Sequence, residues 1–504
     1  MEAQRFVGDE ARPIRGLLPV ASDSPVAHLA VRAVCADSRA VRPGDLFVAI
    51  RGYQADGHAF LKQAAIRGAI AAVVERLVSN VEITQIQVSD TRAAFAQLCW
   101  GLLGDSLGGL DLIGVTGTNG KSTTAWLTRA ILERAGCRVA LLGTIVWQSG
   151  STVRPARLTT PGPAELARFF RHAIRAGCRT VVMEVSSHAL SLRRCVGLQF
   201  AAAAYLGLSR DHLDFHGSME AYAEAKARLF AMLRRDGIAA ALGSDRWAST
   251  VVRDAVERCL WYGFEEWNHV RARVLHADLR GTHFAIVSPW WTGTCTVRLP
   301  GPHNVINALA AATLAGALGV DLPTIRSGLA AAGTVPGRLE RITPPEHVHV
   351  FVDYAHTPDA LRTVLDCLRR YKSPNSRLLV VFGAGGDRDR SKRPLMGRVA
   401  SERAELVIIT DDNPRTEDPE VIVADILQGC SSPANIIVCH NRARAIETAL
   451  DLAQPGDVVL IAGKGHETEQ IIGSVRVPFD DREVVRAWWR RKQGAGGQQQ
   501  RRGA

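Results

Sequence analysis

The sequence lacks the patterns that mark membrane-spanning, secreted or disulfide-linked proteins. No apolar run approaches the roughly 18 residues that a membrane-spanning helix needs. The N-terminus has no basic stretch followed by an apolar run, so we predict no secretory signal. The ten cysteines, from Cys35 to Cys439, include no Cys-x-x-Cys pair, which favours reduced thiols over disulfides or a zinc site. We therefore expect a cytoplasmic protein without a membrane span.

Acidic residues are missing from the last fifteen positions. Residues 490–504 hold four arginines and one lysine, so they account for five of the eleven net positive charges. Their Gly/Gln/Arg composition predicts a disordered tail. Nucleic-acid binding is one interpretation of such a tail, but a solvated tail without nucleic-acid binding is favoured.

The main positive signal is a glycine-rich lysine loop, Gly114-Val-Thr-Gly-Thr-Asn-Gly-Lys-Ser122, between a predicted strand and a predicted helix. Residues 110–115 form an apolar run, and residues 123–135 carry apolar residues at helical spacing. This order places backbone N–H groups and a helix N-terminus where a polyphosphate would bind. Lys121 would neutralise the β- and γ-phosphates, and the Ser122 hydroxyl would bind Mg²⁺. Because Val115 stands where the strict motif has glycine, the loop is a variant.

Two further apolar strands are followed by polar motifs. Residues 179–183 lead into Glu184, and residues 199–206 lead into Ser209-Arg-Asp-His-Leu-Asp214. Ligands of open α/β sheets bind outside the carboxyl ends of the strands. The phosphate loop, Glu184 and His212 are therefore expected to converge.

The last third of the chain repeats this pattern four times. Apolar strands at 348–353, 378–382, 406–410 and 457–461 each precede a Gly- or Asp-rich polar loop and a helical stretch. Such alternation predicts a doubly wound parallel sheet. With 504 residues, the chain is long enough for about three domains.

Together these motifs closely resemble the Mur ligases, the ATP-dependent amide-forming enzymes of peptidoglycan synthesis, and in particular the members that add the third amino acid. The resemblance covers residues 30 to 490. It rests on nine motifs in order: Asp37-Ser-Arg39, Gly117-Thr-Asn-Gly-Lys-Ser122, Glu184-Val-Ser-Ser-His188, Ser209-Arg-Asp-His-Leu-Asp214, Gly301-Pro-His-Asn304, Gly337-Arg338, Asp353-Tyr-Ala-His356, Asp412-Asn-Pro-Arg415 and Gly463-Lys-Gly-His-Glu467.

The resemblance implies an α/β fold of three domains. These are an N-terminal UDP-binding domain (1–108), a central P-loop ATPase-like domain with a parallel sheet (109–336) and a C-terminal Rossmann-like domain (337–504). It also implies that ATP phosphorylates the γ-carboxylate of D-Glu in UDP-MurNAc-L-Ala-D-Glu, and that an amino acid then attacks the acyl phosphate. A monomer is expected.

The resemblance also assigns residues to ATP and Mg²⁺. Lys121, Glu184, His212 and Lys226 would be catalytic, with Mg²⁺ held by Ser122, Glu184, His212 and a carbamylated Lys226 (N6-carboxylysine). Spacing alone predicts that Lys226 is a solvated helix lysine; a carbamate beside metal ions is what the motif context implies. The expected ATP-binding residues are Gly117, Thr118, Asn119, Gly120, Lys121, Ser122, Thr123, Asn304 and Arg338.

The other two substrates are assigned in the same way. Ser38, Tyr53, Gln54 and Ala55 match positions for the uridine nucleotide and sugar, and Thr159, Thr160, Ser186 and Arg194 match positions for the dipeptide. Arg194 suits a substrate that carries carboxylates and phosphates.

For the incoming amino acid the motifs favour meso-diaminopimelate. Arg415 would bind its distal carboxylate and Glu467 its ammonium, while Arg388 would meet the other carboxylate. Asn413-Pro414 would fix the turn that projects Arg415, and Asp412 and Gly463 complete the expected set. An arginine left unpaired in a dry pocket would disfavour lysine by ~10³-fold or more.

Two alternatives remain within this chemistry: the same ligation with L-lysine, and a folylpolyglutamate synthetase-like ligase, which would not be expected to carry the Asp412–Arg415 motif. The chain departs from the family pattern at Leu206-Gly207, where relatives often have Thr-Asn, and at Leu192, which is Gln in some relatives.

Overall fold

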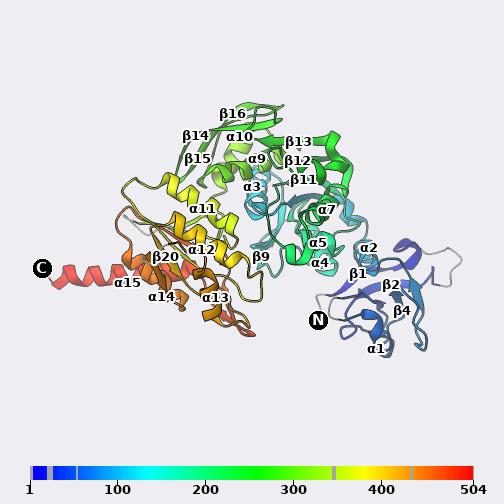
Figure 1. Cartoon of the computed structure of the whole chain (residues 1–504). Helices are drawn as coiled ribbons and strands as arrows, with labels where there is room; N and C mark the ends of the chain where they lie inside the picture. The colour runs from blue at the N-terminus through cyan, green and yellow to red at the C-terminus, as the bar shows by residue number, and fades with distance from the viewer. Residues whose placement is uncertain (1–3, 20–25, 53–54, 343–347, 432–434, 503–504) are drawn as a thin grey trace. The chain divides into compact units, whose positions relative to one another are not determined.

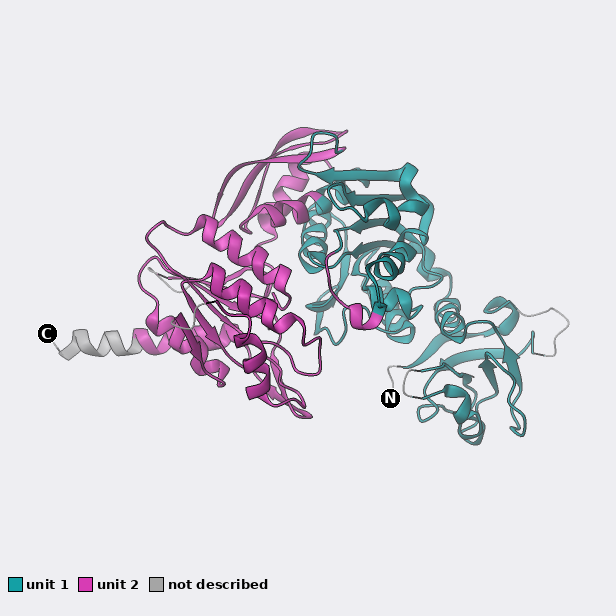
Figure 2. Cartoon of the chain, in the orientation of Figure 1, with its two compact units in different colours: residues 1–208, 216–268, 310–320 teal, residues 209–215, 269–309, 321–504 magenta. Residues whose placement is uncertain are grey.

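The chain contains two compact units, shown in different colours in Figure 2. The computed structural model describes residues 4–19, 26–52, 55–342, 348–431 and 435–502, with side chains described as far as Gln493. The first unit comprises residues 1–208, 216–268 and 310–320, and the second comprises residues 209–215, 269–309 and 321–504.

The N-terminal part of the first unit holds a five-stranded sheet in the order β1-β2-β3-β4-β5, in which only β1 and β2 pair antiparallel. Helix α2 packs on β1, β2 and β4, and it begins where the Asp90 side chain accepts a hydrogen bond from the Ala93 N–H (2.9 Å), a typical N-cap. The elements are β1 (Arg5–Pro13), β2 (Ala30–Cys35), β3 (Leu46–Val48), α1 (Leu61–Ile66), β4 (Ala71–Val74), β5 (Gln85–Gln87) and α2 (Thr91–Leu103).

The rest of the first unit is built on strands in the order β13-β12-β11-β6-β10-β7-β8-β9, parallel from β13 to β7. Helix α3 packs on β6, β7 and β10. The strands are β6 (Asp111–Thr116), β7 (Val139–Leu142), β8 (Val146–Ser149), β9 (Thr152–Pro155), β10 (Thr180–Glu184), β11 (Phe200–Tyr205), β12 (Leu233–Leu242) and β13 (Cys259–Gly263). The helices from here to residue 331 are α3 (Lys121–Arg134), α4 (Pro163–Arg175), α5 (Ser187–Ser191), α6 (Leu213–His216), α7 (Met219–Phe230), α8 (Ala248–Val251), α9 (Pro302–Ala317) and α10 (Leu322–Ala331).

The second unit contains a six-stranded sheet in the order β17-β18-β22-β19-β20-β21, parallel except at β17. Figure 1 labels its strand β20 and the helices α11 to α15. It also contains an antiparallel meander, β14-β15-β16, and a hairpin, β23-β24. The strands are β14 (Val270–Asp278), β15 (Gly281–Val287), β16 (Thr292–Val297), β17 (Glu340–Ile342), β18 (His349–Asp353), β19 (Leu378–Phe382), β20 (Leu406–Ile409), β21 (Ile436–Val438), β22 (Val458–Ala462), β23 (Glu469–Ile472) and β24 (Val475–Pro478). The helices are α11 (Pro358–Tyr371), α12 (Lys392–Arg403), α13 (Pro419–Leu427), α14 (Arg442–Leu452) and α15 (Asp481–Arg502).

Both faces of the six-stranded sheet are buried, which explains why its strands are apolar at successive positions. In β19, Leu378, Val380 and Phe382 pack in one apolar cluster with α11, α12 and α13. The alternate residues, Leu379 and Val381, pack in a second cluster with α14 and α15. The sheet is therefore doubly wound, as the repeated strand and loop pattern predicts.

The α/β fold class predicted from the sequence is confirmed, whereas the domain boundaries at residues 108 and 336 stay predictions. The meander β14–β16 was not anticipated. Only β15 alternates buried and half-exposed residues, whereas β14 and β16 are mostly exposed or half-exposed and lack the apolar runs that mark the other strands. The disorder that the composition of residues 490–504 predicts stays a prediction; the described backbone continues α15 to Arg502. Arg491 and Lys492 pair with Glu447 and Asp451 of α14, and extending a formed helix costs less than starting one.

All ten cysteines are free thiols, as expected. Within the described ranges, none of the helices combines the length and apolar character that crossing a bilayer requires.

Candidate functional site

The glycine-rich loop joins β6 to α3 as predicted. Gly120, at φ 85°, occupies a left-handed conformation that favours glycine and directly precedes the helix. The Lys121 ammonium donates hydrogen bonds to the carbonyls of Gly117 (2.9 Å) and Thr118 (2.8 Å). The Thr118 N–H donates to the backbone carbonyl of Gly207 (3.0 Å), so the backbone at residue 207 supports the loop. The loop thus presents a lysine and a helix N-terminus, the combination that binds phosphate groups.

Glu184 links this loop to its neighbours. It is the last residue of β10 and is 2% exposed. Its carboxylate accepts hydrogen bonds from the Ser122 hydroxyl (3.0 Å), the Thr144 N–H (2.7 Å) and the Thr144 hydroxyl (2.9 Å). The Thr144 and Thr159 hydroxyls lie 3.0 Å apart. Glu184 therefore places one carboxylate directly against the phosphate loop.

The residues expected to hold the dipeptide adjoin Glu184. The Thr160 hydroxyl donates to the Glu184 carbonyl (2.8 Å), and it accepts a hydrogen bond from the Ser186 N–H (3.0 Å). The Arg194 guanidinium donates to the Thr160 carbonyl (2.7 Å), and burial lowers the pKa of Arg194. The structure thus brings together the four residues Thr159, Thr160, Ser186 and Arg194.

Lys226 is 1% exposed, which excludes the solvated helix lysine that spacing alone predicts. It projects from α7, and its Nζ donates to the Gly117 carbonyl (2.9 Å). The same nitrogen lies 4.5 Å from the centre of the Tyr222 ring. The Tyr222 hydroxyl in turn lies 3.2 Å from the Thr118 hydroxyl. Lys226 therefore packs against the phosphate loop.

Of the residues expected to bind the uridine nucleotide, Ser38 is buried and donates to Gln63 Oε1 (2.6 Å). Ala55 is exposed, and its carbonyl accepts from the Gly52 N–H (2.9 Å). Tyr53 and Gln54 lie outside the described residues.

His212, Asn304 and Arg338 belong to the second unit. His212 has φ 55° and its Nε2 lies 3.4 Å from the Asp211 carboxylate. Asn304 is 4% exposed near the start of α9, and its Nδ2 donates to the Pro300 carbonyl (2.8 Å). The Arg338 guanidinium stacks 4.6 Å above the Tyr354 ring.

Residues expected to bind diaminopimelate come together at the carboxyl ends of β20 and β22, two strands that flank β19 in the sheet. Asn413 follows β20 and Glu467 follows β22, and the Asn413 Nδ2 donates to Glu467 Oε2 (3.0 Å). After the buried Pro414, Arg415 has φ 53° and pairs as an isolated bridge with Ile472 of β23. Its guanidinium donates to the Gly386 carbonyl (2.7 Å). The turn therefore holds the Arg415 guanidinium against the backbone of Gly386.

Charged side chains also lie at the carboxyl ends of these strands. Burial, together with the nearby charge of Arg388, lowers the pKa of Arg415. Arg388 itself is exposed. Asp412 Oδ2 is buried without a hydrogen-bond partner in the described part of the chain. It would lie 2.5 Å from a Cβ at residue 463, so Gly463, at φ 110°, cannot carry a side chain without displacing it.

Two further polar residues lie in these networks without having been singled out from the sequence. Thr144 follows the end of β7, so the rule that places ligands at strand ends could have identified it. Lys464 is fully buried between Asn413 and Glu467, and only its position inside the Gly463–Glu467 motif hints at this.

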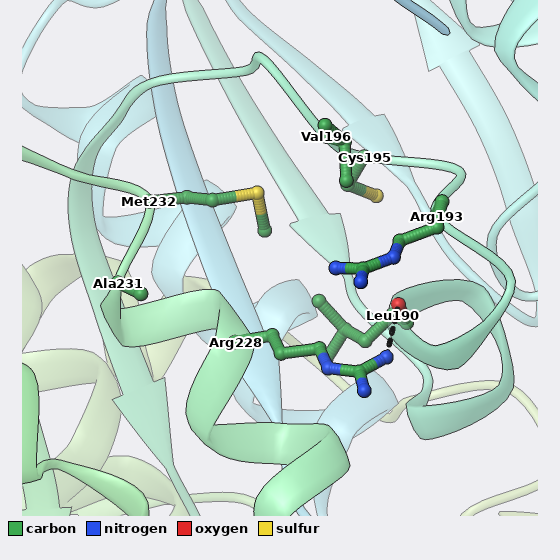
Figure 3. Close-up of a pocket in the computed structure, with 7 residues that line it drawn as sticks. All are labelled: Leu190, Arg193, Cys195, Val196, Arg228, Ala231 and Met232. Atoms are coloured by element: carbon green, nitrogen blue, oxygen red, sulfur yellow. Dashed lines mark hydrogen bonds between the residues drawn. The ribbon is translucent and has the colours of Figure 1, made fainter. Parts of the chain in front are cut away.

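A hollow of about 160 Å³ lies beside α5 and α7 (Figure 3). Arg193 and Arg228 both line it, and Arg228 donates to the Leu190 carbonyl (3.3 Å) (Figure 3). The remaining lining is mostly apolar: Cys195, Val196, Ala231 and Met232. None of the predicted substrate-binding residues lines it.

No group of three His, Cys, Asp or Glu side chains in the described ranges is arranged to hold a metal ion. The oxygens available beside the phosphate loop are the Ser122 hydroxyl and the Glu184 carboxylate. The fold and these residues define a phosphate-loop α/β enzyme with a second, doubly wound sheet.

Comparison with protein-family models identifies the family to which this class of enzyme belongs. The Mur ligase middle domain matches residues 115–315, the Mur ligase glutamate ligase domain matches residues 337–465, and the Mur ligase family catalytic domain matches residues 30–99. The chain belongs to the Mur ligase family.

Similar proteins agree with this assignment. A UDP-N-acetylmuramoyl-L-alanyl-D-glutamate--2,6-diaminopimelate ligase of Caldanaerobacter subterraneus subsp. tengcongensis is 41% identical, over 90% of this chain and 94% of its own. The protein of that name from Chlorobaculum tepidum is 43% identical, over 92% of this chain and 93% of its own. A solved structure of a ligase with the same name has 34% identity and a TM-score of 0.70, covering 96% of this chain and 99% of its own.

Proposed function

We propose that this protein is an ATP- and Mg²⁺-dependent ligase that joins meso-diaminopimelate to the γ-carboxylate of D-Glu in UDP-MurNAc-L-Ala-D-Glu, a step of peptidoglycan precursor synthesis. Relatives about 41% identical over most of the chain carry the name of this activity. The observation that carries the proposal is the cluster of Asn413, Arg415 and Glu467 at the carboxyl ends of β20 and β22, with Arg388 beside it. We place the reaction in the cytoplasm and expect a monomeric enzyme.

The chemistry needs an activated carboxylate, because a free carboxylate is a poor acyl donor. ATP supplies a phosphoryl group to form an acyl phosphate, and the amine of the amino acid then displaces phosphate. Phosphoryl transfer depends mostly on positioning and charge neutralisation. Lys121 and the N–H groups of residues 117–123 would hold the phosphates. Asn304 and Arg338 are the further ATP-binding residues that we propose. Thr159, Thr160, Ser186 and Arg194 would hold the dipeptide, and Ser38 with residues 53–55 the uridine nucleotide.

Mg²⁺ would neutralise the phosphate charge. The Ser122 hydroxyl and the Glu184 carboxylate fit it, because Mg²⁺ prefers oxygen ligands and completes its shell with phosphate and water. His212 and the carbamate of Lys226 are the further ligands that we propose. Burial of Lys226 supports the carbamate, which would remove a positive charge beside a cation.

Diaminopimelate differs from lysine by a second carboxylate at its far end. Arg415 would bind that carboxylate bidentately, and Glu467 would accept the neighbouring ammonium. Two guanidiniums, Arg388 and Arg415, match the two carboxylates of the amino acid. L-Lysine would leave Arg415 without an anion, which is why diaminopimelate is favoured over the lysine alternative.

The test measures phosphate release from ATP with purified protein, Mg²⁺ and UDP-MurNAc-L-Ala-D-Glu. Release is expected with meso-diaminopimelate and barely with L-lysine. Equal rates with both would contradict the amino-acid specificity. Release only with a folate substrate and glutamate would instead support the folylpolyglutamate synthetase-like alternative.

A further inference from the structure

Lys464 occupies the centre of the cluster that follows β20 and β22. Its side chain has no exposed surface, and its ammonium donates hydrogen bonds to Asn413 Oδ1 (3.1 Å) and Glu467 Oε2 (2.9 Å). A charged group in such a place is tolerated only when it is paired and hydrogen-bonded. The charge of Lys464 is therefore compensated by Asn413 and Glu467, which we propose as diaminopimelate ligands. The same hydrogen bonds hold those two side chains in place.

The hydrogen bonds fix the orientation of the Asn413 amide. Its Oδ1 accepts from Lys464 and also from the Ile471 N–H (2.9 Å), and its Nδ2 donates to Glu467 Oε2 (3.0 Å). An amide oxygen has two lone pairs, so both are used. Asn413 therefore has no acceptor to offer a ligand, and its remaining N–H can only meet an anionic or carbonyl oxygen.

The same hydrogen bonds make the surroundings of the two Glu467 carboxylate oxygens different. Oε2 accepts from both Lys464 and Asn413, whereas Oε1 has no hydrogen bond to any of the described residues. The Glu467 side chain is 32% exposed, so Oε1 is accessible. One oxygen is held by the protein, and the other remains available for a cation.

We propose that Lys464 is a positioning residue for the amino-acid substrate: it holds Glu467 with Oε1 available to an ammonium group, and it fixes the Asn413 amide so that a second N–H is all that this side chain can offer, a donor for a carboxylate. The inference rests on the proposed function and deepens it. An acceptor and a donor presented side by side fit the far end of a diamino diacid, which carries an ammonium and a carboxylate on one carbon. They do not fit the lone ammonium at the end of lysine.

The test compares the Lys464→Met variant with the wild type in the phosphate-release assay. Met keeps the length of the side chain and removes the donors. We expect the KM for meso-diaminopimelate to rise ~10-fold or more, because a charged hydrogen bond is lost on each ligand, while the KM for ATP stays unchanged. The matched control is Lys372→Met, since Lys372 also pairs with a carboxylate (Glu405, 3.7 Å) but follows α11 near the start of β19, at the opposite ends of the strands.

A double-mutant comparison separates positioning from a general structural role. With Glu467→Gln already present, adding Lys464→Met is expected to raise the diaminopimelate KM much less than it does alone. Fully additive effects, or a KM for diaminopimelate that does not change in Lys464→Met while the wild type is active, would overturn the inference and leave the proposed function intact. A wild type inactive with every amino acid would overturn both.

Discussion

The Ser122 hydroxyl donates to the Glu184 carboxylate across 3.0 Å, although the two residues are 62 positions apart in the chain. One follows β6 through the phosphate loop and the other ends the adjacent strand β10. Parallel pairing of these strands brings their carboxyl ends to one edge, where a hydroxyl and a carboxylate become neighbours. This pair is the part of the site that we expect to bind Mg²⁺ together with phosphate.

Replacing Glu184 by Gln tests that role, because the amide keeps the shape of the side chain and removes its charge. We expect the Mg²⁺ concentration needed for half-maximal phosphate release to rise ~10-fold or more, as a charged ligand is replaced by a neutral one. The measurement is a Mg²⁺ titration at saturating ATP. Glu220→Gln is the control, since Glu220 is exposed in the first turn of α7. An unchanged Mg²⁺ requirement in Glu184→Gln would contradict the assignment.

Lys121 is expected to act on the phosphates of ATP. Its ammonium donates hydrogen bonds to two carbonyls of its own loop, so it lies beside the position where we expect the phosphates to bind. Lys121→Met should lower kcat ~10²–10³-fold, as is typical when a preorganised donor to a transition-state charge is removed. Steady-state kinetics measure this, with Lys62→Met at an exposed helix position as the control. Near-normal activity of Lys121→Met would show that the loop does not hold the reacting phosphates.

Carbamylation of Lys226 predicts a signal that an ordinary lysine cannot give. A carbamate retains one N–H, so it can keep the bond to the Gly117 carbonyl while it carries a negative charge outward. Protein equilibrated with ¹³C-labelled bicarbonate should show a carbamate resonance that is absent from Lys226→Ala. Activity lost in Lys226→Ala should return in part with a small carboxylate such as acetate. No resonance together with full activity of the variant would exclude the modification.

Glu417 should make the stability of the second unit depend on pH in acid. Hydrogen bonds from the buried Arg393 (2.9 and 3.0 Å) lower the pKa of Glu417 from 4.5 to about 2. Because the folded pKa lies below the unfolded one, this stabilisation is complete above about pH 4.5 and is lost as the pH falls toward 2. Urea unfolding should show the free energy of unfolding decreasing over that range.

Glu417→Gln should flatten this decrease and lower the free energy of unfolding at pH 7 by about 2 kcal/mol, a charged hydrogen bond being lost. The loss is limited because Arg393 keeps its pairing with Asp425 (2.8 Å). The exposed Glu483 on α15 supplies the control, Glu483→Gln. An unaltered pH dependence in Glu417→Gln would show that other carboxylates govern acid stability.

Sequence patterns identified the strands of the second unit well, because a strand buried on both faces is apolar at every position. β18, β19, β20 and β22 were each predicted within about two residues of their bounds. The half-exposed strands β14–β16 escaped detection, since they carry no continuous apolar run. An apolar run in the sequence therefore identifies a strand clearly only when both faces of that strand are buried.

In the candidate site, too, the sequence identified some residues and missed others. Motifs identified Ser122, Glu184 and Lys226, but not that Thr144 holds two of the hydrogen bonds to the Glu184 carboxylate. Nor did they show that Lys464 lies between Asn413 and Glu467. Contacts of this kind depend on which strands become neighbours, and a single sequence does not state the strand order. The chemistry-bearing residues could be predicted, whereas the residues that hold them in place required the fold.

Arg415 should decide which amino acid is accepted. Its guanidinium is half-buried, its backbone is held by Ile471 and Gly473, and its charge would meet the distal carboxylate of diaminopimelate. We expect the wild type to prefer meso-diaminopimelate over L-lysine by ~10³-fold in kcat/KM, and Arg415→Ala to lose most of that preference because the unpaired cation no longer penalises lysine. Competition between the two amino acids in the phosphate-release assay measures the ratio. ATP affinity should be unaffected in Arg415→Ala, and Arg476→Ala, at an exposed arginine that pairs with Glu469 across the β23–β24 hairpin, should behave as the wild type. A preference that survives Arg415→Ala would mean that the second carboxylate is read by another residue.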